Sequence, residues 1–182
     1  MTKPGYGKQK GGEYERTICK ELSLWVSNNK RDDIFWRSAM SGGRATFQRK
    51  KGINNKTQLG DITAIDSLGQ NLTNLFIIEC KYYQDLKLEN LVYKTSVSGI
   101  ISMWNTLINS CKINKKYPML IAKQNFKPDL IFVNGYTERF LSKYYDNFYY
   151  EAYMPKYNLC VYTLNSFLQI VDYKIFEKVI SE

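Results

Sequence analysis

The sequence predicts an α/β protein in which a mixed central β-sheet of about five strands is flanked by helices. Apolar residues recur at helical spacing in two segments, one near the N-terminus and one in the middle of the chain. Short apolar runs bounded by proline, asparagine or glycine follow these segments, as is typical of strands. No change of composition along the 182 residues separates two units, so we expect a single domain, residues 1–182.

The first element in chain order is a helix. We expect it from about residue 12 to 28 or 29, after a flexible basic tail of residues 1–11. At 100° per residue, Glu15 lies about 60° from Ile18 in the apolar stripe, whereas Glu13 lies about 140° away. Glu15 is therefore the acidic residue that this helix directs into the fold, although the helix dipole alone also favours a glutamate in the first turn.

An edge strand is expected at residues 34–36, and a long mobile basic loop, residues 41–59, follows it. Arginine and lysine residues gather in this loop around one phenylalanine. Such a segment suits contact with a phosphate backbone and stacking on a base, although a solvated surface loop has the same composition. The candidate contact residues in the loop are Arg44, Phe47, Arg49, Lys50, Lys51 and Lys56.

The stretch from residue 60 to 82 predicts a β-hairpin. Two β-rich runs flank a polar segment, residues 67–73, whose glycine and asparagines are typical of a turn. Antiparallel pairing about this turn places Asp61 directly opposite Glu79, with Cα atoms about 4.5–5.5 Å apart. The two-residue period of a strand puts Lys81 on the same face as Glu79. We therefore expect Asp61, Glu79 and Lys81 to converge.

Helix and strand continue to alternate after the hairpin. Apolar residues at helical spacing predict a helix from about residue 88 or 97 to 112. Two short apolar runs, residues 119–122 and 130–133, are expected to be buried strands.

The C-terminal segment, residues 136–182, is rich in tyrosine and phenylalanine. We expect an extension packed on the core, with a helix, a strand near 159–162 and a closing helix from about Asn165. Its aromatic side chains are more typical of packing than of a base-stacking platform.

The expected cluster of Asp61, Glu79 and Lys81 suits a metal site that cleaves nucleic acid. Like charges directly opposite each other on a sheet repel unless something positive lies between them. Mg²⁺ takes oxygen ligands and is typically held by one or two carboxylates together with phosphate oxygens and water. Lys81 is placed to orient or deprotonate an attacking water, or to stabilise charge on the phosphate. Ordinary surface charges are the alternative.

Charge and composition restrict the chemistry. Lysine and arginine total 26 against 17 aspartate and glutamate residues, a formal net charge of +9 that favours a polyanionic partner such as nucleic acid. A basic but otherwise ordinary soluble protein is the alternative. The chain has no histidine, which excludes zinc sites with imidazole ligands and Ser-His-Asp hydrolysis.

The cysteines and the N-terminus indicate the compartment. Cys19, Cys80, Cys111 and Cys160 lack the C-x-x-C spacing of zinc or redox motifs, so we expect reduced, mostly buried thiols. No segment has the length and apolar composition of a signal or a membrane span. We expect a soluble, cytoplasmic protein with no membrane partner and no nucleotide cofactor.

Two short motifs carry a family resemblance. Gly60-Asp61 followed by Glu79-Cys80-Lys81 resembles the core of the PD-(D/E)XK nuclease superfamily. Within it, residues 10–133 are similar to archaeal-type Holliday junction resolvases. Lys10-Gly11-x-x-x-Glu15-Arg16 matches their first-helix motif, and Arg37-Ser38-Ala39 matches the segment after their first strand. The chain departs from these resolvases in having glycine rather than proline before Asp61 and a longer loop after Ser38. Its residues beyond Tyr136 have no counterpart in the resolvases.

The resemblance implies a restriction-endonuclease-like fold acting on DNA with Mg²⁺, for which Mn²⁺ should substitute. It places Glu15, Asp61, Glu79 and Lys81 at the catalytic positions. It assigns the metal to Asp61, Glu79, the backbone carbonyl of Cys80 and, directly or through water, Glu15. Ser38 lies beside them, and we count Arg37 and Ser38 among the expected DNA contacts.

We therefore expect a Mg²⁺-dependent endonuclease that acts on branched DNA, as a homodimer if it cuts two strands symmetrically. A restriction-like or end-processing PD-(D/E)XK nuclease is the alternative within the same class. A DNA-binding or architectural module is the alternative of another class, and such a module has no need of Lys81 beside two carboxylates.

Overall fold

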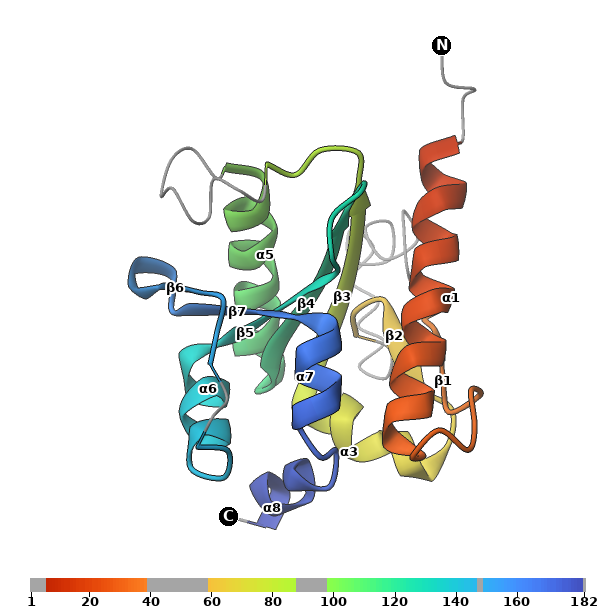
Figure 1. Cartoon of the computed structure of the whole chain (residues 1–182), viewed down its shortest axis with the longest axis vertical. Coiled ribbons are helices and arrows are strands. Elements are labelled where there is room, and N and C mark those ends of the chain that lie inside the picture. Colours follow the sequence, from red (N-terminus) through yellow and green to blue (C-terminus); the bar gives the residue numbers. More distant parts are fainter. Residues whose placement is uncertain (1–5, 39–58, 88–97, 147–148, 182) are drawn as a thin grey trace.

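The computed structural model describes residues 6–38, 59–87, 98–146 and 149–181. Its central sheet has five strands in the order β3-β4-β5-β7-β6 (Figure 1). The strands are β3 (Phe76–Tyr83), β4 (Tyr117–Gln124), β5 (Leu130–Asn134), β6 (Ala152–Met154) and β7 (Leu159–Thr163). β3 and β4 are parallel and the other neighbours are antiparallel, which confirms the mixed α/β fold predicted from the sequence.

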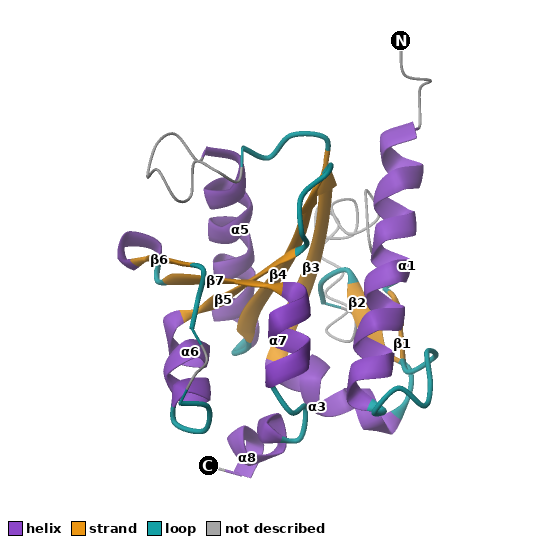
Figure 2. Ribbon diagram, in the orientation of Figure 1, coloured by secondary structure: helices purple, strands orange, loops and turns teal. Residues whose placement is uncertain are grey.

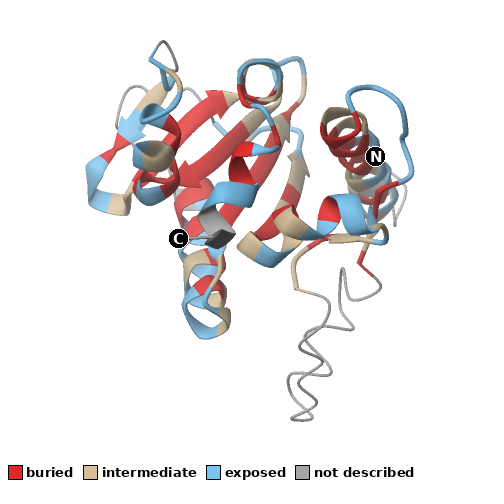
Figure 3. Cartoon of the chain, turned by 90° about the horizontal axis from the view of Figure 1, so that it is seen from below, coloured by how far each residue is buried: buried red, intermediate tan, exposed pale blue. Residues whose placement is uncertain are grey.

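Helices cover both faces of this sheet (Figure 2). α5 (Ser98–Asn114) packs on one face, where Trp104 and Leu107 join a core with Ile77 of β3. The other face carries the larger core, to which Ile78 of β3 and Ile18 of α1 belong. The helices that contribute to it are α1 (Tyr6–Val26), α3 (Ser67–Leu75), α6 (Gly135–Ser142), α7 (Leu164–Ile170) and α8 (Ile175–Ser181). Figure 3 shows the buried residues concentrated along the sheet and on the inner sides of these helices.

A separate two-stranded ribbon lies beside β3. It pairs β1 (Phe35–Arg37) with β2 (Ile62–Ala64) in antiparallel register, with Trp36 opposite Thr63. The ribbon meets the free edge of β3 at Asp61, whose N–H donates to the carbonyl of Ile78 at 2.8 Å. Asp61 thus reaches the central sheet although β2 belongs to another one.

The hairpin expected across residues 60–82 is wrong. The polar segment at 67–73 belongs to helix α3, which Asp66 caps by accepting the Leu68 N–H. Leu72 anchors this helix in the core at 0 % exposure. β2 pairs with β1 and β3 pairs with β4, so β2 and β3 are not partners in a hairpin, and the segment that joins them is a helix instead of a turn.

Helix α1 begins at Tyr6 and not near residue 12, so residues 6–11 are helical although we expected a tail. Lys10 is tied to the sheet: its Nζ donates to Asn125 Oδ1 at 2.7 Å and lies 3.9 Å from the centre of the Tyr82 ring. At the other end, Trp25 Nε1 donates to the Val171 carbonyl at 2.8 Å, which joins α1 to the C-terminal helices.

The C-terminal third is part of the central sheet. β7 lies between β5 and β6, with Phe132 opposite Val161, so this segment does not simply pack on the core as an extension. The expectation that its aromatic residues serve packing holds for Tyr162 and Phe167, which are buried. It does not hold for five tyrosines of this segment that are exposed: Tyr136, Tyr144, Tyr149, Tyr150 and Tyr153.

The four cysteines are buried and free, as predicted. Among the described residues, no helix combines the length and the apolar character needed to cross a membrane.

Candidate active site

Backbone geometry brings Asp61 to the edge of β3. Gly60 has φ +80°, a conformation that proline cannot adopt because its ring holds φ near −65°. A Cβ atom at Gly60 would lie only 2.5 Å from the Ile78 carbonyl oxygen. Glycine in place of the proline of related motifs is therefore what lets this turn pass so close to β3.

Asp61, Glu79 and Lys81 form one contact cluster, as predicted. Lys81 Nζ donates to Asp61 Oδ2 at 3.1 Å and to Glu79 Oε2 at 2.7 Å. Asp61 Oδ2 also accepts the backbone N–H of Cys80 at 2.9 Å. One ammonium group thus bridges the carboxylate of Glu79 in β3 and that of Asp61, the residue just before β2.

The backbone carbonyl of Cys80 faces this cluster. In a β-strand the N–H and C=O of one residue point to the same edge, and the Cys80 N–H points to Asp61. β3 is the first strand of the sheet, so this edge is not covered by a neighbour within that sheet. The arrangement therefore offers a third oxygen beside the two carboxylates.

The charged groups of the cluster shift the pKa values of Glu79 and Lys81. Burial, followed by the charge of Asp61, raises the pKa of Glu79 from 4.5 to about 7, although Lys81 opposes this change. Burial disfavours the ammonium form of Lys81, but the charges of Glu79 and Asp61 outweigh it and raise the pKa of Lys81 above 10.5. In the metal-free protein Lys81 is therefore a charged donor at neutral pH and Glu79 is poised to take up a proton.

The raised pKa of Glu79 predicts a pH-dependent stability in EDTA. A carboxyl group with a higher pKa in the folded state binds more protons there, so its contribution is fully present below pH 4.5 and is lost as the pH rises through about 7. Between pH 5 and 8, the wild type should lose on the order of 2 kcal/mol of unfolding free energy relative to Glu79→Gln. Urea unfolding of both proteins at several pH values measures this difference, and parallel pH profiles would contradict it.

Glu15 points inward, as expected, but its partner is Arg37. The Arg37 Nε donates to Glu15 Oε2 at 2.6 Å, and no hydrogen bond from a described residue joins Glu15 to Asp61, Glu79 or Lys81. Alternation along β3 explains this. Ile78 and Cys80 face the core that α1 supplies, so Glu79 and Lys81 project on the side of Ile77 and α5. Arg37 as the partner of Glu15 could not be inferred from helical spacing.

Ser38 supports the backbone beside the cluster. It is 3 % exposed, and its hydroxyl donates to the Gly60 carbonyl at 2.8 Å while its N–H donates to the Asp61 carbonyl at 2.9 Å. We expected Ser38 both beside the catalytic residues and in contact with DNA, and the structure places it as a buried support for Gly60 and Asp61. The remaining expected DNA contacts, Arg44, Phe47, Arg49, Lys50, Lys51 and Lys56, lie outside the described residues.

The oxygen ligands of this cluster suit a magnesium ion that keeps some water ligands, and not a metal enclosed entirely by protein ligands. Within residues 6–38, 59–87, 98–146 and 149–181, no group of three or more cysteine, aspartate or glutamate side chains is placed to hold a metal ion. Two carboxylates and one carbonyl remain, all of them oxygen donors. Mg²⁺ commonly binds through one or two carboxylates and keeps water and substrate oxygens as its other ligands.

Gly60 provides a test of how Asp61 is positioned. We expect Gly60→Ala to lower the unfolding free energy by about 1–3 kcal/mol, because the new Cβ meets the Ile78 carbonyl and φ is positive. Gly11→Ala is the matched control: nothing lies within 4 Å of its Cβ in helix α1, so it should raise stability by about 0.5–1 kcal/mol. Denaturant unfolding measures both, and equal stabilities of the Gly60→Ala variant and the wild type would contradict the expectation.

The chain matches the sequence model of one known protein family over most of its length. The sequence model of the family described as phage putative PDDEXK endonuclease matches residues 6–177. The chain belongs to this family. This PD-(D/E)XK nuclease matches no curated protein and no solved structure. The match extends from α1 to α8 and includes the C-terminal strands, which we had left without a counterpart. Membership makes the protein a nuclease and implies DNA as its substrate.

Proposed function

We propose that this protein is a Mg²⁺-dependent endonuclease that hydrolyses DNA phosphodiester bonds. The observation that carries the proposal is the bridge of Lys81 between Asp61 and Glu79 at the edge of β3. Two like charges close together destabilise a fold unless a cation compensates them, as the Lys81 ammonium does here. A DNA-binding module without activity has no need to gather these three side chains at one place.

Asp61, Glu79 and the Cys80 carbonyl are the residues that would hold the metal. Mg²⁺ bound there would lower the pKa of a coordinated water and shield the charge of the phosphate. Lys81, as a charged donor, hydrogen-bonds to the attacking water or to the phosphate oxygen on which charge develops. Ser38 and Gly60 keep Asp61 in register with Ile78 and Cys80.

Plasmid cleavage tests the activity. The protein is incubated with supercoiled plasmid in Mg²⁺, in Mn²⁺ and in EDTA. Cleavage with either metal and none in EDTA is expected. Binding of the plasmid without cleavage in either metal would support the DNA-binding module instead.

We further propose a preference for branched DNA, with cutting of two strands by a homodimer. Support comes from the resemblance of two motifs to those of Holliday junction resolvases, since Glu15 of one motif and Arg37 of the other form an ion pair in this protein. A four-way junction and a linear duplex of the same sequence separate the possibilities. Faster cleavage of the junction is expected, and equal rates would favour a restriction-like or end-processing nuclease. Sedimentation of the protein with and without the junction tests the dimer.

The role of Glu15 can be separated from simple ion pairing. If Glu15 contributes to the metal site through water, Glu15→Gln should raise the Mg²⁺ concentration needed for half-maximal cleavage about tenfold. Arg37→Gln is the matched variant, since it breaks the same 2.6 Å ion pair but leaves the carboxylate in place. Cleavage rates over a Mg²⁺ titration measure the effect. Equal Mg²⁺ requirements of the two variants would show that the pair is only structural.

A further inference from the structure

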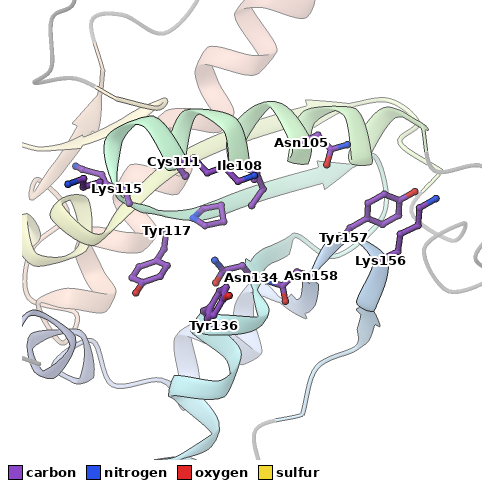
Figure 4. A pocket seen from close by; sticks show the side chains of 13 residues that line it. Asn105, Ile108, Cys111, Lys115, Tyr117, Asn134, Tyr136, Lys156, Tyr157 and Asn158 are labelled. Carbon is purple, nitrogen blue, oxygen red and sulfur yellow. The ribbon is translucent and has the colours of Figure 1, made fainter.

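A second concave site lies away from the catalytic cluster. A cavity of about 610 Å³ opens between the C-terminal half of α5, the start of β4, the start of α6 and η1 (Pro155–Tyr157) (Figure 4). Its volume falls within the range of small-molecule binding pockets, about 300–1,000 Å³. Asp61, Glu79 and Lys81 are not among its lining residues.

The walls of this cavity are held by hydrogen bonds between elements. Trp104 Nε1 of α5 donates to the Tyr157 carbonyl at 3.0 Å, which fixes η1 against the helix. Asn134 caps α6 by accepting the Thr137 N–H at 2.9 Å, and the Gly135 N–H donates to the Asn158 carbonyl at 3.3 Å. The cavity is therefore largely formed before any ligand binds.

Its lining is strongly basic. Lys112, Lys115, Lys116 and Lys156 line it, whereas no aspartate or glutamate does so among the described residues. None of these lysines forms an ion pair with a described side chain. Lys116 Nζ donates to the Thr73 carbonyl, and burial lowers its pKa, so positive charge here is costly without an anion. The other three lysines are exposed and can meet a phosphate, with Lys156 Nζ lying 5.3 Å from the centre of the Tyr157 ring.

Aromatic rings and amides complete the lining. Tyr136 is 63 % exposed and Tyr117 is 38 % exposed, and Figure 4 shows both beside the gap between α5 and α6, with Tyr157 at the opposite end. A nucleic-acid base of any of the four kinds can stack on such rings. Asn105 and Asn158 add amide groups that can hydrogen-bond to the edge of a base.

We propose that this pocket binds an unpaired nucleotide of a DNA strand, with its phosphate among the lysines and its base against a tyrosine ring. The proposal rests on DNA being the substrate, but not on cleavage at the Asp61–Glu79–Lys81 cluster. A branched or opened duplex supplies such an unpaired nucleotide, whereas a fully paired duplex does not.

Binding in EDTA tests this pocket independently of cleavage. Fluorescein-labelled dT12 and a 12-base-pair duplex are titrated with the wild type and variants, and binding is followed by polarisation. Lys112→Ala/Lys156→Ala and Tyr136→Ala should each weaken dT12 binding about tenfold or more. These side chains are exposed, so the substitutions should leave the fold intact. Duplex binding by Tyr136→Ala should stay within about twofold of the wild type.

Two matched controls separate the pocket from general charge effects. Lys30→Ala/Lys174→Ala removes the same charge from exposed sites elsewhere, and Tyr149→Ala removes a tyrosine that is 78 % exposed. Both should bind dT12 as the wild type does. Equal losses in pocket and control variants, or an unchanged dT12 affinity of Tyr136→Ala, would overturn the proposal. Thymidine monophosphate serves as a competitor. If it displaces dT12 from the wild type but not from Tyr136→Ala, a single nucleotide occupies the pocket. If it does not displace dT12 from the wild type, the proposal is overturned.

Discussion

Substitution of Asp61 by asparagine is expected to abolish DNA cleavage, by about a thousandfold or more, while DNA binding persists. The amide oxygen can still accept the Cys80 N–H, so the backbone stays in place. The substitution replaces a charged oxygen ligand with a neutral amide oxygen, at a site to which the described residues contribute two carboxylates. Plasmid cleavage in Mg²⁺ and gel shift in EDTA measure the two properties separately.

The control for this substitution is Asp32→Asn. Asp32 lies on the surface, where its side chain is 60 % exposed and its Oδ2 lies 3.7 Å from Lys20 Nζ. The substitution changes net charge equally but should leave cleavage unchanged. Full activity of Asp61→Asn, or an equal loss in Asp32→Asn, would refute the assignment of Asp61 to the active site.

Substitution of Lys81 by methionine is expected to remove cleavage and to destabilise the metal-free protein. The change leaves Asp61 and Glu79 facing each other without the ammonium that bridges them. At pH 8 the unfolding free energy should fall by about 1–3 kcal/mol. The loss should be smaller at pH 6, because Glu79, with a pKa raised to about 7 by burial and by Asp61, then takes up a proton.

Mg²⁺ should reverse this loss. A divalent cation compensates the two carboxylates, and in Lys81→Met it no longer competes with the ammonium group, so the rise in Tm on adding Mg²⁺ should exceed that of the wild type. Lys127→Met is the control, since Lys127 is exposed and should change stability by less than about 0.5 kcal/mol. A Tm of Lys81→Met that is the same in Mg²⁺ and EDTA would contradict a metal site at these carboxylates.

The convergence of Asp61, Glu79 and Lys81 could be predicted from the sequence, but the path of the chain between them could not. Glycine and asparagine in residues 67–73 are typical of turns, and this local signal favoured a hairpin. Contacts with residues that are distant in the sequence stabilise a helix instead. Gly69 packs against Phe35, whose ring carbon would lie 2.8 Å from a Cβ, and Leu72 is fully buried. Because β2 pairs with β1 and not with β3, residues 67–75 are not required to form a turn, and a helix fits there.

For Glu15, the direction of the side chain could be predicted from the sequence, but its partner could not. Helical periodicity correctly indicated that Glu15, and not Glu13, faces the protein, because direction about a helix axis depends on spacing alone. The identity of its partner depends on where β1 places Arg37, which is a matter of tertiary structure. The C-terminal strands follow this rule too: β7 was foreseen as a strand, but its insertion between β5 and β6 was not.

The position of β3 at the border of the sheet has a consequence for solubility. Outermost strands can recruit a strand from another molecule, and proteins guard against this with charged side chains. In the β3 sequence FIIECKYY, Glu79 and Lys81 are the sole charged residues. Asp61 occupies part of this border through its hydrogen bonds to Ile78 and Cys80. We expect Glu79 and Lys81 to limit self-association through the rest of it, so that variants which neutralise both residues aggregate at lower concentrations than the wild type.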